Sequence, residues 1–212
     1  PTPLVRVSPN AAEVMANQWV LKQTLDHGAY GIILPRLESV EAARAAVVGC
    51  RYTQRVGDPD VEPRGGRGWD PTLAAPYWGL SAQEYTQVAD LWPLDPDGEV
   101  LLMGLCETED GVKNLHRILS EVQGIGVVWV AAGDLAVSMG AGPNPSDPRV
   151  EEAVMSTLQT CRRHGMPCAV VARSEEELDR RMDQGFQVFF ALHEMASPVL
   201  AHGRKKLAGY PS

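Results

Sequence analysis

The 212-residue chain lacks the features of several protein classes. No apolar run approaches the roughly 18 to 20 residues that cross a bilayer, and no charged segment followed by an apolar one opens the chain. Basic residues are also in deficit, with 19 Lys and Arg against 27 Asp and Glu and a formal net charge of -8. Nucleic acids and acidic lipid surfaces do not attract such a protein, so we expect a cytoplasmic chain whose partners are small molecules or other proteins.

Cysteine is scarce and scattered. The chain has four cysteines, without C-x-x-C spacing and without clustered histidines: Cys50, Cys106, Cys161 and Cys168. This arrangement favours neither a zinc site nor a disulfide framework. We expect reduced thiols that are mostly buried in apolar segments.

Short apolar runs alternate with longer amphipathic stretches, and 44% of the residues are hydrophobic. This alternation is typical of βα units that build a parallel sheet. Strands are expected at 3–7, 30–35, 100–107, 126–132, 166–172 and 186–192. Helices are expected at 10–28, 39–50, 81–91, 110–122, 148–164, 175–185 and 195–207. Because the strands are apolar throughout, we predict a single domain over residues 1–212, an α/β fold of the TIM (β/α)8-barrel type with six βα units in this chain.

Residues 51–80 form an unusually long connection that is rich in Gly, Pro and Arg. Loops of this length in compact domains tend to be functional or disordered. Its aromatic residues Trp69, Tyr77 and Trp78 either shape a specificity pocket or pack the loop, and packing is the favoured interpretation.

Carboxylates follow two of the predicted strands. Glu107 comes directly after the apolar run 100–106, where a carboxylate is desolvated unless it is paired or binds a cation. The alternative for Glu107, Glu109 and Asp110 together is a helix start, because acids in a first turn complement the helix dipole. We assign Glu109 and Asp110 to that structural role and keep Glu107 as a candidate for function.

Asp134 follows the predicted strand 126–132, and it is also a good N-cap for a short helical turn. Glu107 and Asp134 at neighbouring strand ends would lie close enough to share a hard cation such as Mg²⁺. The backbone N–H groups of Gly133 and Asp134 would then suit a substrate carboxylate.

Arg6 stands inside the apolar strand 3–7, where a cation is costly unless it points toward an anion. It is either an edge-strand or salt-bridged arginine, or a residue that faces the active end of the barrel. In the second case its charge would stabilise an oxyanion or enolate on the substrate.

At these residues the sequence resembles the HpcH/HpaI aldolase family, the metal-dependent pyruvate aldolases that include 2,4-dihydroxyhept-2-ene-1,7-dioate aldolase. The similarity runs from about residue 3 to 173, in the family's order. It is carried by VRV-x-x-N at Arg6, HGAYGIILPRLESVEAARAAV, RY followed by PRGGRG, ETEDGVKNL at Glu107, and GDLAVSMG with the P-x-V-E-x-A segment after it.

The resemblance implies a carbon–carbon lyase, a class II aldolase that cleaves or forms 4-hydroxy-2-keto acids through a metal-bound pyruvate enolate. Glu107 and Asp134 match the ligands of the divalent ion, Mg²⁺ or Mn²⁺, and Arg6 matches the arginine that stabilises the enolate. The substrates would be a pyruvate-type keto acid and an aldehyde. Relatives are oligomers, so a homo-oligomer, either a trimer or a hexamer, is expected.

The sequence also departs from the family. Relatives usually begin with two further βα units, and a histidine for proton transfer follows the second; the chain resembles an N-terminally shortened member. Either an initiator Met was trimmed or upstream sequence is missing. Leu105 stands where many relatives have glutamine. Two alternatives therefore stay open: a non-catalytic relative that binds metal and keto acid, and a citrate-lyase β-like acyl-CoA lyase, which the acidic balance disfavours.

Overall fold

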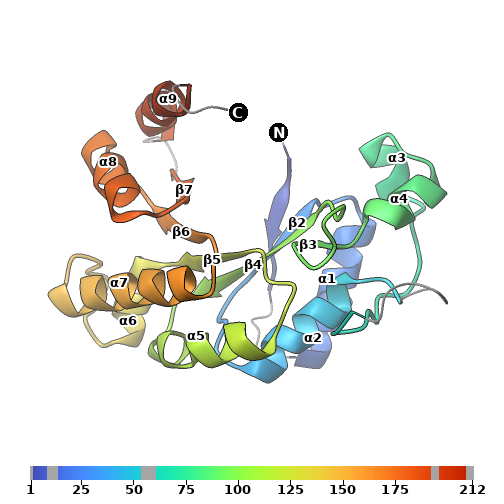
Figure 1. Cartoon of the computed structure of the whole chain (residues 1–212), viewed down its shortest axis with the longest axis horizontal. Helices are drawn as coiled ribbons and strands as arrows, with labels where there is room; N and C mark the ends of the chain where they lie inside the picture. The colour runs from blue at the N-terminus through green and yellow to red at the C-terminus, as the bar shows by residue number, and fades with distance from the viewer. Residues whose placement is uncertain (1, 9–13, 54–60, 192–195, 209–212) are drawn as a thin grey trace.

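A computed structural model describes residues 2–8, 14–53, 61–191 and 196–208 of the chain. In this part a single parallel sheet runs in the order β1-β2-β4-β5-β6-β7, and the short strand β3 pairs with β4. The strands are β1 (Leu4–Arg6), β2 (Gly31–Leu34), β3 (Leu91–Trp92), β4 (Val100–Cys106), β5 (Val127–Val130), β6 (Cys168–Val171) and β7 (Val188–Phe190). Figure 1 shows that the sheet curls without closing.

Helices connect the strands and cover the outer side of the sheet (Figure 1). They are α1 (Val14–Asp26), α2 (Val40–Cys50), α3 (Ala74–Trp78), α4 (Ala82–Val88), α5 (Glu109–Glu121), α6 (Ala132–Ser138), α7 (Pro148–Arg163), α8 (Glu175–Gln184) and α9 (Ala196–Leu207). Several begin where the sequence offers a hydroxyl or carboxylate cap, because that side chain accepts a hydrogen bond from a free N–H of the first turn. These caps are Ser39, Ser81, Thr108, Asp147 and Ser174.

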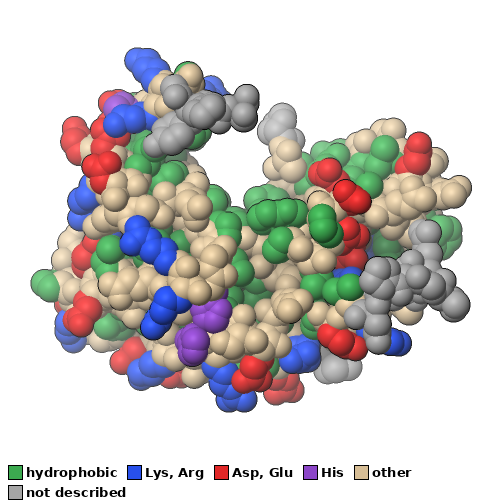
Figure 2. Space-filling view, viewed as in Figure 1, with side chains coloured by type: hydrophobic (Ala, Val, Ile, Leu, Met, Phe, Trp, Pro, Cys, Tyr) green, Lys and Arg blue, Asp and Glu red, His purple; other side chains and the backbone are tan. Residues whose placement is uncertain are grey.

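The sheet is apolar on both faces, which explains the unbroken hydrophobic runs of β2, β5 and β6. Alternate residues such as Leu34 and Val128 join the large core between the sheet and the helices. The residues between them, such as Ile33 and Trp129, form a second apolar cluster with Met103 and Leu105. Figure 2 shows hydrophobic side chains in the hollow that the curled sheet encloses.

The expected α/β class with a parallel sheet is confirmed. The described residues form a curled half-barrel whose main path has six strands, and they do not form a closed barrel. The single-domain assignment and the resemblance to an N-terminally shortened family member stay predictions. No helix in the described part of the chain is long and apolar enough to cross a membrane.

Two local expectations were wrong. The helix expected at 81–91 ends at Val88, and Leu91 instead starts β3 beside Val100, where its side chain is fully buried. Pro93 disfavours helix at the residue before it, so the chain extends there. The strand expected at 126–132 is shorter, because Ala132 already begins α6. The expected helix starts at Asn10 and Met195 lie outside the described residues.

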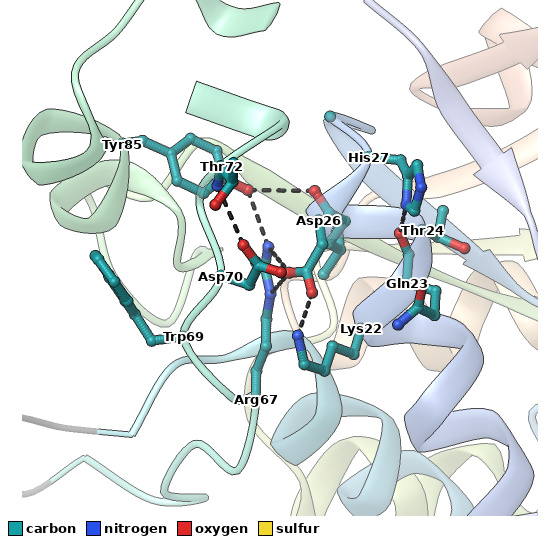
Figure 3. Close-up of polar contacts among 12 residues, drawn as sticks. Lys22, Gln23, Thr24, Asp26, His27, Arg67, Trp69, Asp70, Thr72 and Tyr85 are labelled. Carbon is teal, nitrogen blue, oxygen red and sulfur yellow. Dashed lines mark hydrogen bonds and ion pairs between the residues drawn. The ribbon is translucent and has the colours of Figure 1, made fainter. Parts of the chain in front are cut away.

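The described part of the 51–80 connection is anchored by buried arginines. Arg51 pairs with Asp90 through two hydrogen bonds of 2.7 and 2.8 Å. Arg67 is fully buried and pairs with Asp26, and it donates a second bond of 3.0 Å to the Tyr85 hydroxyl (Figure 3). This part of the connection is therefore a packed element of the fold.

The aromatic residues of the connection divide into two groups. Trp78 stacks on Tyr30 with ring centroids 3.8 Å apart, and its indole N–H donates to the Gly28 carbonyl. Packing is confirmed for Trp78. Trp69 and Tyr77 are each 65% exposed, and they pack only in part: Trp69 donates to the Thr86 hydroxyl and the Tyr77 ring lies against Gly28. The four cysteines are all free and buried, as expected.

Candidate active site

Two neighbouring strands bring the predicted carboxylates to one end of the sheet. Cys106 at the end of β4 pairs with Val130 at the end of β5, and Glu107 and Asp134 follow these strands. Both carboxylates line one cavity of about 480 Å³. The predicted pairing of strand ends is thus present, and it places two acids where the active end of a βα fold lies.

Glu107 is a buried carboxylate with one oxygen committed and one oxygen open. Its side chain is 5% exposed. The Oε1 atom accepts a hydrogen bond of 2.9 Å from the backbone N–H of Arg36. The Oε2 atom is buried and has no hydrogen-bond partner, and Arg6 Nη2 lies 3.9 Å from it. A buried carboxylate oxygen without a hydrogen bond is a candidate ligand for a cation, because a cation would compensate its lost hydration.

The surroundings of Glu107 disfavour its charge. Burial raises the pKa of the carboxyl above its usual range, and the nearby charge of Asp134 adds to the rise. The hydrogen bond from Arg36 and the charges of Arg6 and Arg36 oppose this pKa shift without cancelling it. A cation between the two carboxylates would relieve both causes of the rise.

Arg36 is a site residue that the sequence analysis missed. It directly follows Pro35 at the end of β2 and adopts a left-handed backbone with φ 53°. Non-glycine residues rarely adopt this conformation, and they do so mostly where the surrounding structure requires it. Here it directs the N–H toward Glu107 while the next residue, Leu37, donates to the Leu105 carbonyl at 2.8 Å. Its position after a strand could have indicated it, because the same criterion, a polar residue at a strand end, selected Glu107.

Arg6 reaches the site from the edge of the sheet. It lies on β1, the edge strand of the described sheet, and its guanidinium approaches Glu107. Its side chain is 56% exposed, because an edge strand leaves that side open, so the cost of burying a cation inside an apolar strand does not arise. The two interpretations of Arg6 are compatible, because an edge-strand arginine can still face the site.

Asp134 lies at the third position of α6, and its assignment as an N-cap was wrong. The cap residue is Ala131, which makes no side-chain capping bond, because the helix starts immediately after β5. The first backbone bond of this helix runs from Leu135 to Ala131. The N–H groups of Gly133 and Asp134 therefore precede the intrahelical bonds, and nothing lies within 4 Å of where a Cβ on Gly133 would be.

Glu109 and Asp110 are first-turn acids of α5, as predicted. Thr108 is the cap, and its hydroxyl accepts a bond from the Gly111 N–H. Glu109 lies 3.5 Å from Lys113 one turn later. Both acids also line the cavity, so their charges contribute to its negative field.

The donor set of the cavity suits a hard divalent cation. Glu107 and Asp134 offer carboxylate oxygens, and Mg²⁺ typically takes one or two carboxylates together with water and substrate oxygens. The part of the chain that the structure describes contains no arrangement of three or more His, Cys, Asp or Glu that could hold a metal. Leu105, at the position where many relatives have glutamine, is buried in the apolar cluster of the hollow.

The chain is similar to known proteins over most of its length. The sequence profile described as HpcH/HpaI aldolase/citrate lyase matches residues 1–197. The chain is 30% identical over 188 residues to the 4-hydroxy-2-oxo-heptane-1,7-dioate aldolase of Klebsiella pneumoniae, which covers 89% of this chain and 64% of that protein. It is 32% identical over 177 residues to the 4-hydroxy-2-oxovalerate aldolase of Rhodococcus jostii, which covers 84% and 61%. The chain thus spans less than two thirds of the length of these relatives.

A solved structure gives the same result for the fold. The crystal structure of an HpcH/HpaI aldolase/citrate lyase family protein from Burkholderia cenocepacia J2315 superposes with a TM-score of 0.75 at 25% identity. The match covers 98% of this chain and 72% of that one. The family profile covers 197 of the 212 residues of the chain. The chain belongs to the HpcH/HpaI aldolase/citrate lyase family.

Proposed function

We propose that the chain carries the catalytic end of a divalent-metal-dependent aldolase that cleaves, or forms, 4-hydroxy-2-keto acids. The observation that carries the proposal is the buried Oε2 of Glu107, which has no hydrogen-bond partner, lies near Arg6 and belongs to a carboxylate in one cavity with Asp134. The family and the named activities of the relatives support it.

Each residue has a role in this proposal. Glu107 and Asp134 hold Mg²⁺ or Mn²⁺, which when bound supplies Lewis-acid polarisation of the substrate's keto group. Arg6 provides a fixed positive charge next to the oxygen that becomes negative when pyruvate forms its enolate. The N–H groups of Gly133 and Asp134, at the start of α6, hold the substrate carboxylate. Arg36 keeps Glu107 oriented through its backbone.

The described cavity has few side chains that could act as the acid or base in proton transfer. The ionisable groups lining it in the described part of the chain are carboxylates and one arginine, without a histidine. This observation favours a second candidate function, in which the protein binds metal and keto acid but does not convert the substrate. Both functions share the binding roles of Glu107, Asp134 and Arg6.

The experiment that separates them starts from pyruvate alone. In D₂O with Mn²⁺ or Mg²⁺, an aldolase exchanges the methyl protons of pyruvate for deuterium, which proton NMR follows directly. Pyruvate release from 4-hydroxy-2-oxopentanoate is then measured with and without EDTA. We expect exchange and cleavage that both stop with EDTA. Cleavage that continues in EDTA would overturn the metal role, and ligand binding without exchange would favour the non-catalytic function.

The remaining expectations stay predictions. A citrate-lyase β-like activity on acyl-CoA remains an alternative within the same family, and it is tested by cleavage of an acyl-CoA substrate in the same assay. The expected trimer or hexamer is tested by measuring the mass of the protein in solution. The expected cytoplasmic location is tested by cell fractionation.

A further inference from the structure

Arg36 is the only cation among the described residues that line the cavity of Glu107. The other ionisable groups there are five carboxylates: Glu38, Glu107, Glu109, Asp110 and Asp134. A substrate that brings a second carboxylate into this cavity meets repulsion from these acids. The guanidinium of Arg36 is the group within the lining that offsets it.

The backbone and the side chain of Arg36 contact different residues. The backbone N–H is committed to Glu107. The side chain is 47% exposed, and its Nη2 lies 3.0 Å from Glu38 Oε1. Within the described residues, the hydrogen bond and the ion pair of the guanidinium are both made by this one terminal nitrogen, which leaves Nε and Nη1 for a ligand. A guanidinium presents several N–H donors in one plane and binds a carboxylate through two parallel hydrogen bonds.

We propose that Arg36 is the specificity residue for the aldehyde partner, and that it selects aldehydes carrying a terminal carboxylate. The inference rests on the proposed function, because it presumes that the keto acid occupies the Glu107 and Asp134 side of the cavity. The aldehyde then lies beside the keto acid, and Arg36 stands next to Glu107. Glu38 holds the guanidinium in place until the substrate carboxylate replaces it.

The named substrates of two relatives differ in whether they carry a second carboxylate. A 4-hydroxy-2-oxo-heptane-1,7-dioate has a second carboxylate at its far end, whereas a 4-hydroxy-2-oxovalerate has none, and this chain is similarly related to aldolases named for each. Overall similarity therefore does not decide the aldehyde. The charge of Arg36 favours the acid-bearing class.

The test compares two aldehydes of equal length, succinic semialdehyde and butyraldehyde, as acceptors for pyruvate. The quantity is the ratio of their kcat/KM values within each variant, which cancels any shared change in pyruvate activation. We expect wild type to prefer succinic semialdehyde, Arg36→Met to lose this preference at least tenfold, and Arg36→Lys to keep part of it. Glu38→Gln should raise the preference, because it removes the competitor for the guanidinium.

The outcomes separate the two proposals. If wild type exchanges pyruvate protons but the ratio is the same in Arg36→Met, the role of Arg36 is wrong and the aldolase proposal stands. If wild type shows no exchange, the aldolase proposal fails. Succinate binding by calorimetry then decides on Arg36: weaker binding to Arg36→Met than to wild type supports a carboxylate site, and equal or undetectable binding overturns it. Unfolding temperatures of all variants verify that they fold.

Discussion

The backbone N–H of Arg36 donates a 2.9 Å hydrogen bond to Glu107 Oε1, which joins residues 71 positions apart in the chain. The bond ties the end of β2 to the residue after β4, two strands that pair in parallel. It fixes one carboxylate oxygen and leaves the other directed toward Arg6. The neighbouring strand thus orients the proposed metal ligand through main chain, which a side-chain substitution at Arg36 does not remove.

Glu107→Gln should stabilise the metal-free protein. Burial disfavours the ionised form of Glu107, so its raised pKa means that the charge costs folding free energy at neutral pH. Removing the charge should gain about 1 kcal/mol of unfolding free energy, within the usual range of a single stabilising substitution. Thermal unfolding in EDTA measures this as a higher Tm for the variant. Adding Mn²⁺ should raise the Tm of wild type and leave that of the variant unchanged. A lower Tm in EDTA would contradict the assignment of Glu107 as a destabilising, ligand-free carboxylate.

Asp134→Asn should abolish the stabilisation by Mn²⁺ and most of the proposed activity, because one of the two proposed charged metal ligands is lost. Glu109→Gln is the matched control, since Glu109 lines the same cavity but serves the start of α5. Its cost should be a few tenths of a kcal/mol in unfolding free energy, the usual contribution of an exposed first-turn acid. Pyruvate release and the Mn²⁺-dependent Tm shift are measured on both. Equal losses in the two variants would mean that cavity charge in general, rather than Asp134, holds the metal.

Arg6→Met should lower kcat for cleavage by about 10²-fold, the effect of removing one preorganised stabiliser of a developing oxyanion. The Mn²⁺-dependent rise in Tm should remain, because Arg6 is not a metal ligand in this proposal. Steady-state kinetics at saturating substrate give kcat, and Arg6→Lys shows whether charge alone suffices. A kcat equal to that of wild type would leave Arg6 as an ordinary edge-strand residue.

Arg67→Met should destabilise the fold by about 3 kcal/mol, because Asp26 would be left buried with Lys22 as its ion-pair partner (Figure 3). The matched control is Arg64→Met, three residues earlier in the same PRGGRG segment, whose side chain is 65% exposed. Urea unfolding should show less than about 1 kcal/mol for this control. Similar losses in the two variants would contradict the view that Arg67 anchors the connection through its buried ion pair.

Glu151→Gln should make stability less sensitive to acid. Hydrogen bonds from Arg181, which is almost fully buried, lower the pKa of Glu151 below its ordinary value. A lowered carboxyl pKa contributes stability above the unfolded-state pKa, and this contribution is lost as pH falls through the folded-state pKa. The difference in unfolding free energy between wild type and Glu151→Gln should therefore be about 2 kcal/mol at pH 7, below the 3–5 kcal/mol of fully buried pairs because Glu151 is partly exposed. Urea titrations from pH 7 to pH 3 should show it shrinking, and a pH-independent difference would contradict the ion pair as its cause.

Local patterns in the sequence were enough to predict most of the elements. The serines at 39, 81 and 174 cap the helices that were expected to start there, because a cap is a contact within one turn. The apolar runs became parallel strands, of which β2, β5 and β6 are fully buried, and the acids Glu109 and Asp110 lie in a first turn as expected. The errors were also local: β3 is two residues long, and α6 starts directly after β5, where no capping side chain marks the boundary.

The sequence by itself determined the family, the parallel α/β class and the choice of Glu107, Asp134 and Arg6, because these depend on residue order and on polar residues at strand ends. The tertiary structure decided which atoms of those residues are available. The burial of Glu107, its Oε2 without a hydrogen bond and the left-handed Arg36 that holds its other oxygen arise where β2 pairs with β4. Contacts across 71 residues are set by packing in three dimensions, and spacing along the chain does not encode them.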